Sequence, residues 1–302
     1  MKLPSSAPEY VQDEEKIVNW LSQLTNQSPI SVRSRLQQER DNLGTNVSRA
    51  LHQYGLEPYR WTDELTEFYS RTDAFLYELI VWNLNKRKRR IRRRIGKYLY
   101  KNLRPHLDIL TVGDGLGVDS VYLTRAGHHV TYFETSAYAQ AFAKKFFADC
   151  ALDIKVLDDQ NQIPQNSYDV VICSDVLEHV PAPPEFVKTI TSYLKLNGHL
   201  IIHAPFYYIH PSTPTHLKSN RKYSGSLRLF EKHGLRLVDG ELSWAPITLK
   251  KTASRKTDCS QFKPKLLAVR LTGLYLALGR FTILPFLWVK SYQRKGQRWF
   301  KK

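Results

Sequence analysis

Cysteine is scarce in this chain of 302 residues, which contains only Cys150, Cys173 and Cys259. The three lie far apart and form no C-x-x-C pair, so the sequence predicts neither a disulfide framework nor a cysteine zinc site. This usage is typical of a reducing compartment. Residues 1–16 carry acids and lack the apolar core of a secretory signal. We therefore expect a cytoplasmic protein.

The net charge of the whole chain is unusually high, +17 at pH 7, and acidic residues are absent or nearly absent from two basic segments. Residues 86–104 hold eleven Lys and Arg and no acid, and residues 250–302 hold fourteen against Asp258 alone. Such clusters commonly contact phosphate, either on nucleic acid or on anionic lipid. The remainder of the chain is mildly acidic, so these two segments are the candidate contact surfaces.

Strand patterns are missing from residues 1–104, which show only helical periodicity. Ser28 is a candidate N-cap, with Pro29 at the first helical position and Gly44 as a stop. A second helix is expected to start at Thr62 and to cover 62–83. The basic stretch 83–103 predicts a third helix, whose apolar stripe comprises Leu84, Ile91, Ile95 and Tyr98.

The period changes at residue 107, where short apolar runs begin to alternate with helical stretches. These runs cover 107–112, 130–134, 153–157, 168–173 and 199–204. The alternation favours βαβ units and a parallel sheet, and two further strands are expected at 235–244 and 245–250. We expect a helical extension over 1–104, an α/β domain over 105–250, and a basic, apolar helical segment over 251–302.

A glycine-rich stretch, "ILTVGDGLGVDS" at 109–120, lies between a predicted strand and a predicted helix. Its pattern is G-x-G-x-G, whereas dinucleotide sites have G-x-G-x-x-G, and it lacks the Lys-Ser/Thr of a P-loop. A nucleoside with a small charged tail is then the favoured ligand. Glu134, at the end of the next strand, is placed to bind ribose hydroxyls. The alternative is a tight turn beside a surface glutamate.

Taken with four later blocks, this stretch resembles the class I S-adenosylmethionine-dependent methyltransferases over about residues 105–245. The blocks are Glu134 itself, "LDDQNQIPQNSYDVVICSDVLEHV", "LKLNGHLIIHAP" and "PTHLKSNRKYSGSLRLFEKHGLRLV". The resemblance implies a doubly wound, mostly parallel, seven-stranded Rossmann-like sheet of α/β class. It also implies that the cofactor is S-adenosylmethionine.

The resemblance assigns the cofactor site by position. Gly113, Gly115 and Gly117 would line the amino-acid and ribose side, and Glu134 would hold the ribose diol. Either Asp158 or Asp159 would meet the adenine, and Ser174 and Asp175 would lie beside the methionine portion. The family usually has an acid where this chain has Thr111, and Asp114 is a candidate to replace it.

Methyl transfer to a hydroxyl group requires a base near neutrality, and histidine suits this role. His179 and His216 are the catalytic candidates, because the resemblance places their blocks beside the cofactor. The alternative is that His179 packs the turn and His216 is an exposed loop residue. His128, His129 and His199 are expected to be structural.

The stretch "DVLEH" raises the question of a metal. Asp175, Glu178 and His179 would share one face of a helical turn, and the spacing resembles the E-x-x-E-H metal site of ubiquinone-type O-methyltransferases. Many relatives with this turn use no metal, and the first ligand here is the shorter Asp. We expect no metal, with these three residues as the candidates if one binds.

The acceptor is expected to be a small molecule, a lipid or a glycan, methylated at oxygen. An RNA 2′-O-methyltransferase and an inactive binding module are the alternatives, the second because of Thr111. Segment 86–104 offers only Tyr98 and Tyr100 for stacking on bases, which disfavours RNA.

The apolar stretch from Leu266 to Val289 has the length of a membrane span, but Arg280 and Arg270 lie within it. A basic, aromatic flank follows at 290–302. The pattern favours a segment at an anionic membrane surface, hence peripheral attachment to the cytoplasmic membrane. The alternative is a pair of helices folded over the methyltransferase core.

Overall fold

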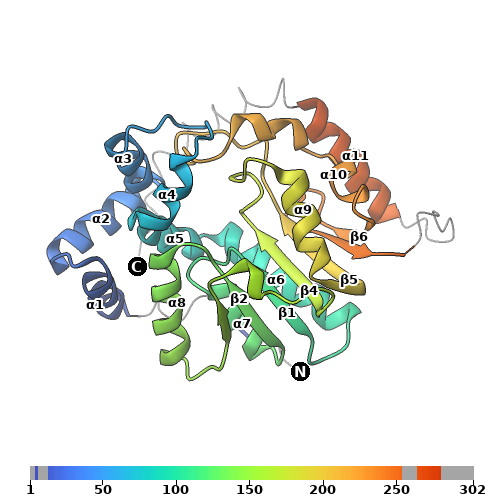
Figure 1. The fold of residues 1–302 in the computed structure, drawn as a ribbon, viewed down its shortest axis with the longest axis horizontal. Helices are drawn as coiled ribbons and strands as arrows, with labels where there is room; N and C mark the ends of the chain where they lie inside the picture. The colour runs from blue at the N-terminus through green and yellow to red at the C-terminus, as the bar shows by residue number, and fades with distance from the viewer. Residues whose placement is uncertain (1–3, 6–12, 254–263, 280–302) are drawn as a thin grey trace.

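A seven-stranded sheet lies at the centre of the computed structural model, which describes residues 4–5, 13–253 and 264–279 (Figure 1). The strand order is β3-β2-β1-β4-β5-β7-β6. The strands are β1 (Asp108–Val112), β2 (His129–Phe133), β3 (Lys155–Leu157), β4 (Tyr168–Ser174), β5 (Leu194–His203), β6 (Leu235–Gly240) and β7 (Ile247–Lys251). The first five strands run parallel, and β7 is antiparallel to both of its neighbours.

The predicted doubly wound, mostly parallel sheet is therefore confirmed. Strands β2 and β3 lie on one side of β1, whereas β4 lies on the other side. The strand order therefore reverses between β1 and β4. In open α/β sheets, ligands bind beyond the carboxyl ends of the strands at such a switch point.

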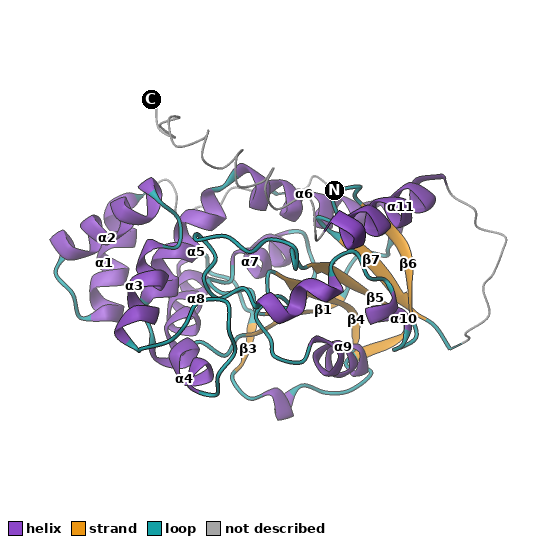
Figure 2. Ribbon diagram, turned by 90° about the horizontal axis from the view of Figure 1, so that it is seen from above, coloured by secondary structure: helices purple, strands orange, loops and turns teal. Residues whose placement is uncertain are grey.

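Side chains along each strand point alternately to the two faces of the sheet, so each face has its own hydrophobic cluster, and helices cover both faces. One hydrophobic cluster contains Ile109 and a second contains its neighbour Leu110. The first cluster joins the sheet to α1 (Glu14–Thr25), α2 (Pro29–Asp41), α5 (Ala74–Leu84), α6 (Lys86–Asn102), α7 (Val118–Arg125) and α8 (Ala137–Asp149). The second joins it to α9 (Pro183–Ser192), α10 (Arg228–Glu231) and α11 (Pro264–Gly279). Figure 2 shows the N-terminal helices gathered at the opposite end of the molecule from α11.

The helix starts follow their capping residues. Ser28 caps α2 by accepting a hydrogen bond from the Ser31 amide at 3.3 Å, with Pro29 at the first position, as predicted. Gly44 follows the end of α2 and is also the N-cap of α3 (Thr45–Gln53), with a φ of +85°. At α6 the cap is Asn85, whose side chain accepts from the Arg87 amide at 2.8 Å. Leu84 consequently belongs to α5, and not to the apolar stripe of α6.

The single helix predicted over 62–83 was wrong, because the structure has α4 (Glu64–Arg71) followed by α5. Thr72 adopts an extended conformation between them, and its hydroxyl accepts a hydrogen bond from the Ala74 amide at 3.2 Å. A threonine side chain that binds nearby backbone in this way competes with helix continuation. The break directs α4 toward the loop that follows β5, where Leu217 joins the cluster of α3 and α4.

The C-terminal helix α11 packs against β6 and the segment before β7. Val269 is fully buried, and its carbonyl accepts a hydrogen bond from the Trp244 indole at 2.9 Å. This packing agrees with the alternative in which the segment folds onto the core, as far as Gly279. Residues 280–302, with Arg280 and the basic flank, lie outside the described residues. None of the helices in the described part of the chain has the length and hydropathy needed to cross a membrane.

Candidate functional site

The glycine loop joins β1 to α7 at the switch point of the sheet. Gly113, Gly115 and Gly117 all have positive φ angles, of +69°, +58° and +74°. A Cβ atom at Gly113 would overlap the side chain of Val176, and one at Gly115 would overlap Leu79. The absence of side chains at these glycines therefore lets Val176 and Leu79 pack against the loop.

Glu134 lies just beyond the end of β2 and touches the glycine loop. One carboxylate oxygen accepts a hydrogen bond from the Gly115 amide at 2.9 Å. The other accepts from the amides of Thr135 and Ser136 at 2.8 and 3.0 Å. Burial raises the pKa of Glu134, while these three amide donors oppose the shift. The carboxylate is thus oriented beside the loop, and its binding to a ribose stays a prediction.

Thr111 and Asp114 are linked through one hydroxyl group. Thr111 is buried on β1, with its Oγ1 2.8 Å from Ser120 Oγ. Asp114 receives hydrogen bonds from that same Ser120 hydroxyl at 2.6 Å and from the Ser120 and Asp119 amides. Burial, followed by the charge of Asp119, raises the pKa of Asp114 to about 7. An acid is therefore present in the loop, but it is used to cap the first turn of α7.

The remaining predicted cofactor residues lie at the ends of β3 and β4. Asp158 and Asp159 are both exposed, and Asp159 accepts a hydrogen bond from the Asn161 amide at 2.9 Å. Ser174 is buried at the end of β4, and its hydroxyl has no hydrogen-bond partner among the described residues. Contact of Asp158 or Asp159 with an adenine stays a prediction.

The basic helix α6 directs two of its cations into the protein. Lys88 is 6% exposed and Arg92 is 1% exposed. Arg92 Nε lies 2.5 Å from Asp119, in the first turn of α7. Lys88 Nζ lies 3.4 Å from Asp119 and 3.1 Å from Asp175. Burial alone would lower the pKa of Lys88, but these two carboxylates raise it above its usual value.

Asp175 is held by groups from three elements and lies apart from the other candidate metal ligands. Its carboxylate binds Lys88, the Trp82 indole at 3.2 Å and His203 Nδ1 at 2.7 Å. Burial raises the pKa of this carboxyl, but Lys88 and His203 outweigh it and hold it well below its usual range. Asp175 has a φ of +63°, so residues 175–179 do not form the expected helical face. The grouping of Asp175 with Glu178 and His179 was wrong.

His216 takes the place expected for Asp175. Ligand atoms of Glu178, His179 and His216 lie within 4.8 Å of one another. The two imidazole rings meet edge to face, with centroids 4.7 Å apart. His216 Nε2 lies 3.9 Å from Glu178 Oε1. The two histidines come from different loops, one following β4 and one following β5, which meet at the carboxyl ends of these neighbouring strands.

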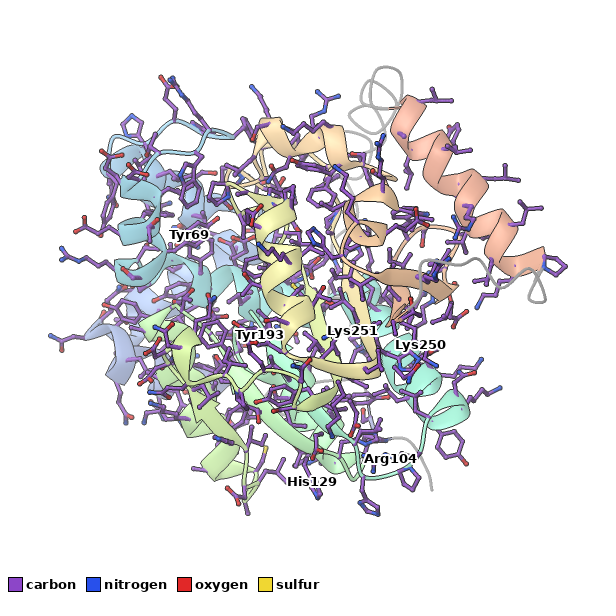
Figure 3. The ribbon with its side chains drawn as sticks, turned by 45° about the vertical axis from the view of Figure 1, so that its right-hand side comes forward. Tyr69, Arg104, His129, Tyr193, Lys250 and Lys251 are labelled. Carbon is purple, nitrogen blue, oxygen red and sulfur yellow. The ribbon has the colours of Figure 1, made fainter. Side chains whose placement is uncertain are left out.

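Hydrogen bonds orient both rings of this cluster. His216 Nδ1 lies 2.6 Å from the Tyr208 carbonyl oxygen, which can only accept, so Nδ1 carries the proton and Nε2 has a free lone pair. His179 Nδ1 lies 3.2 Å from the Thr215 carbonyl oxygen and 3.0 Å from the Tyr69 hydroxyl. Tyr69, labelled in Figure 3, comes from α4 of the N-terminal extension.

Burial controls the protonation of the cluster. It lowers the pKa of His179 to about 4 and that of His216 well below its usual value, so both rings are neutral near pH 7. Burial, followed by Asp175, raises the pKa of Glu178 well above its usual value. Glu178 is 1% exposed, and neither of its carboxylate oxygens has a hydrogen-bond partner among the described residues.

These residues fit a divalent cation in their chemistry. Two neutral imidazoles and a carboxylate are a common ligand set for zinc and for iron(II). Carbonyl groups orient both rings through Nδ1, as outer partners of metal-bound histidines do. Zinc–ligand bonds of about 2.1 Å imply ligand separations of roughly 3.4 Å, so side chains now up to 4.8 Å apart would have to draw together.

Several residues of this region were missed in the sequence. Lys88 and Arg92 are spaced i, i+4 on one face of α6, which is a usable signal, yet a basic helix is usually solvated. Tyr69 and His203 gave no local signal, because they reach His179 and Asp175 only through the fold.

Of the histidines expected to be structural, His128 is buried and its Nδ1 accepts a hydrogen bond from the Leu107 amide at 3.3 Å.

Comparison with known proteins gives the family. A family model described as a methyltransferase domain matches residues 84–240, which is just over half of the chain. The match begins at the end of α5 and so includes α6. Together with the strand order and the glycine loop, it shows that the chain belongs to the class I S-adenosylmethionine-dependent methyltransferases, whose cofactor is S-adenosylmethionine.

Among curated proteins, the mitochondrial ubiquinone biosynthesis O-methyltransferase of Schizosaccharomyces pombe is 35% identical over 100 residues, covering 31% of this chain and 36% of that protein. Phosphoethanolamine N-methyltransferase 1 of Arabidopsis thaliana is 29% identical over 118 residues, covering 38% and 24%. The chain thus spans well under half the length of these relatives. Of solved structures, magnesium protoporphyrin IX methyltransferase from Synechocystis PCC 6803 has a TM-score of 0.42 at 20% identity, covering 61% and 86%.

Proposed function

We propose that this protein transfers a methyl group from S-adenosylmethionine to an oxygen of a small-molecule, lipid or glycan acceptor. The observation that carries the proposal is the buried cluster of Glu178, His179 and His216 beside the cofactor loop. Val176, two residues before Glu178, packs directly against Gly113. A group that handles an acceptor proton would therefore lie next to the loop expected to hold the methyl donor.

The histidines supply the proton chemistry in this proposal. Methyl transfer from a sulfonium requires an in-line acceptor and exclusion of water, and a hydroxyl acceptor must also lose its proton. His216 Nε2 has a free lone pair, and its Nδ1 is fixed by a carbonyl group. His216 is thus the favoured base. His179 and Tyr69 position it, because the two imidazole rings touch and Tyr69 lies against His179.

A divalent cation at Glu178, His179 and His216 is the second candidate. The carboxylate oxygens of Glu178 favour it, since a buried carboxylate to which no other residue donates a hydrogen bond is costly. Such a cation would lower the pKa of an acceptor hydroxyl. It would also compensate for the low basicity that burial gives to both histidines.

Labelled S-adenosylmethionine with a cell extract, separated into lipid, glycan, small-molecule, RNA and protein fractions, tests the proposal. We expect label in one of the first three fractions, lost with His216→Ala and retained with the exposed-residue control His106→Ala. Loss of labelling after dialysis against a chelator, with recovery on adding zinc or manganese, would assign the cation. Label in no fraction would contradict the proposal.

Two alternatives make different predictions. An RNA 2′-O-methyltransferase would bind RNA tightly and lose that binding as salt is raised, but the inward direction of Lys88 and Arg92 removes two cations from the surface of α6. An inactive binding module would fail to bind S-adenosylmethionine at millimolar concentration. We also propose that the protein is cytoplasmic and attaches peripherally to an anionic membrane.

A further inference from the structure

The outer face of α11 is apolar where a surface helix is ordinarily polar. Five side chains on this face are large, hydrophobic and 42–74% exposed: Leu267, Leu271, Leu274, Tyr275 and Leu278. At 100° per residue they lie within one stripe about 100° wide. Figure 3 shows side chains of α11 extending away from the body of the molecule. We refer to these five residues as the outer stripe.

The inner face of the same helix already packs against the protein core, so the outer stripe is not the face with which α11 contacts that core. Val269 is fully buried against β6, and Lys265 and Arg270 form ion pairs with Asp239 and Glu231. Gly273 approaches Gly225 so closely that a Cβ on either residue would overlap the other's backbone. These contacts fix the rotation of the helix and leave the outer stripe facing solvent.

We propose that the outer stripe of α11 docks onto the surface of a bilayer that contains anionic phospholipid. Residues 263–302 contain ten Lys and Arg and no acid, which complements a negatively charged headgroup layer. A second copy of the chain is a poorer occupant, because two chains that each carry a net charge of +17 repel one another. This inference specifies the surface and the lipid for the membrane attachment proposed above.

The contact with Gly225 gives the docking a consequence for the site. Gly225 lies in the segment between β5 and β6 that also carries His216. In this arrangement α11 would lie between the bilayer and the segment that supplies a catalytic candidate. This placement suits an acceptor that is a lipid or is linked to one.

Co-sedimentation of the full chain with vesicles of phosphatidylcholine, with and without phosphatidylglycerol, tests the inference. The variant Leu271→Glu/Leu274→Glu/Leu278→Glu should bind anionic vesicles at least tenfold more weakly than the unchanged chain. The control for added negative charge at other surfaces is Ile30→Glu/Leu196→Glu, since these side chains are 81% and 57% exposed on other elements. It should bind like the unchanged chain, and neutral vesicles should bind weakly.

Two further measurements on the triple variant separate this inference from the proposed activity and from misfolding. Its circular dichroism and its affinity for S-adenosylmethionine by calorimetry should match the unchanged chain. Equal vesicle binding by the triple variant, or no binding by the unchanged chain, overturns the inference whatever its methyl-transfer activity. Dimers in analytical ultracentrifugation that the triple variant abolishes, without vesicle binding, would assign the outer stripe to a second copy instead.

Discussion

Lys88 Nζ lies 3.1 Å from Asp175 Oδ2, and this contact joins the N-terminal helices to the carboxyl end of β4. The two residues come from α6 and from the turn after β4. The same ammonium lies 3.4 Å from Asp119, at the start of the helix that follows the glycine loop. One buried cation thus joins the glycine loop, the turn after β4 and the N-terminal helices.

Removal of this cation should destabilise the fold. Lys88→Met keeps the length of the side chain but removes the ammonium that two buried carboxylates share, which costs about 3–5 kcal/mol even though Arg92 and His203 remain in place. Urea unfolding followed by circular dichroism measures the free energy of unfolding. Arg90→Met is the control on the same helix, because Arg90 is exposed and its replacement should change the stability by about 0.5 kcal/mol or less. Equal losses for both variants would contradict a specific role for Lys88.

Replacement of Glu134 tests the ribose assignment. Glu134→Ala should weaken S-adenosylmethionine binding about 10- to 100-fold, the range expected for hydrogen bonds to a charged group. Glu134→Gln should weaken it less, since the amide oxygen can still accept from the Gly115 amide. Calorimetry gives the affinities, and Glu185→Ala on α9 is an exposed control. Unchanged affinity in Glu134→Ala would remove the assignment.

Asp114 should make the stability depend on pH in a direction opposite to that of a salt-bridged acid. Its folded pKa of about 7 exceeds the unfolded value of about 3.9. The folded state therefore binds the extra proton between these values, and this group's contribution to stability falls as pH rises from about 4 to 7. Asp114→Asn removes the ionisation and keeps one accepting oxygen for the cap of α7, but its amide nitrogen cannot accept the second hydrogen bond. Between pH 4 and pH 7 the stability of the variant should therefore fall less steeply with pH than that of the unchanged chain, measured by urea unfolding.

His179 should remain neutral across the physiological range. Burial lowers its pKa to about 4, so its ring resonances should not titrate between pH 5.5 and pH 8. An ordinary histidine titrates near pH 6.5. NMR of the ¹³C-labelled protein measures this, with the signal assigned from the His179→Ala variant. A titration midpoint near pH 6.5 would show that the ring is accessible to water. The cluster of Glu178, His179 and His216 would then not be shielded from solvent as proposed.

The Gly113 loop offers a test of packing. Gly113→Ala introduces a Cβ that overlaps Val176 and places alanine at a φ of +69°, so both strain and overlap should destabilise the fold by about 1–3 kcal/mol. Val176→Ala in the same chain should restore part of that loss by removing the overlap, leaving the backbone strain. If the loss of unfolding free energy in the double variant is at least the sum of the losses in the two single variants, the overlap is not the cause.

The sequence by itself determined the elements that depend on short-range patterns. Apolar runs separated by helical stretches predicted the strands, the "ILTVGDGLG" spacing predicted the glycine loop between β1 and α7, and Ser28–Pro29 predicted the start of α2. These features depend on capping, side-chain periodicity and glycine conformation, which act within a few residues. The break at Thr72 was missed although it is also local, because one hydroxyl–amide contact overrode a continuous helical pattern.

Only the tertiary structure decided which charged and titratable groups meet. The sequence grouped Asp175 with Glu178 and His179 because they are neighbours in the chain, but a positive φ at Asp175 turns it toward Lys88 and His203. His216 joins Glu178 and His179 because β4 and β5 are adjacent in the sheet. The direction of Lys88 into the protein likewise depends on acids far away in sequence. Such pairings depend on strand order and helix rotation, and those are set by burial of the whole core rather than by any local segment.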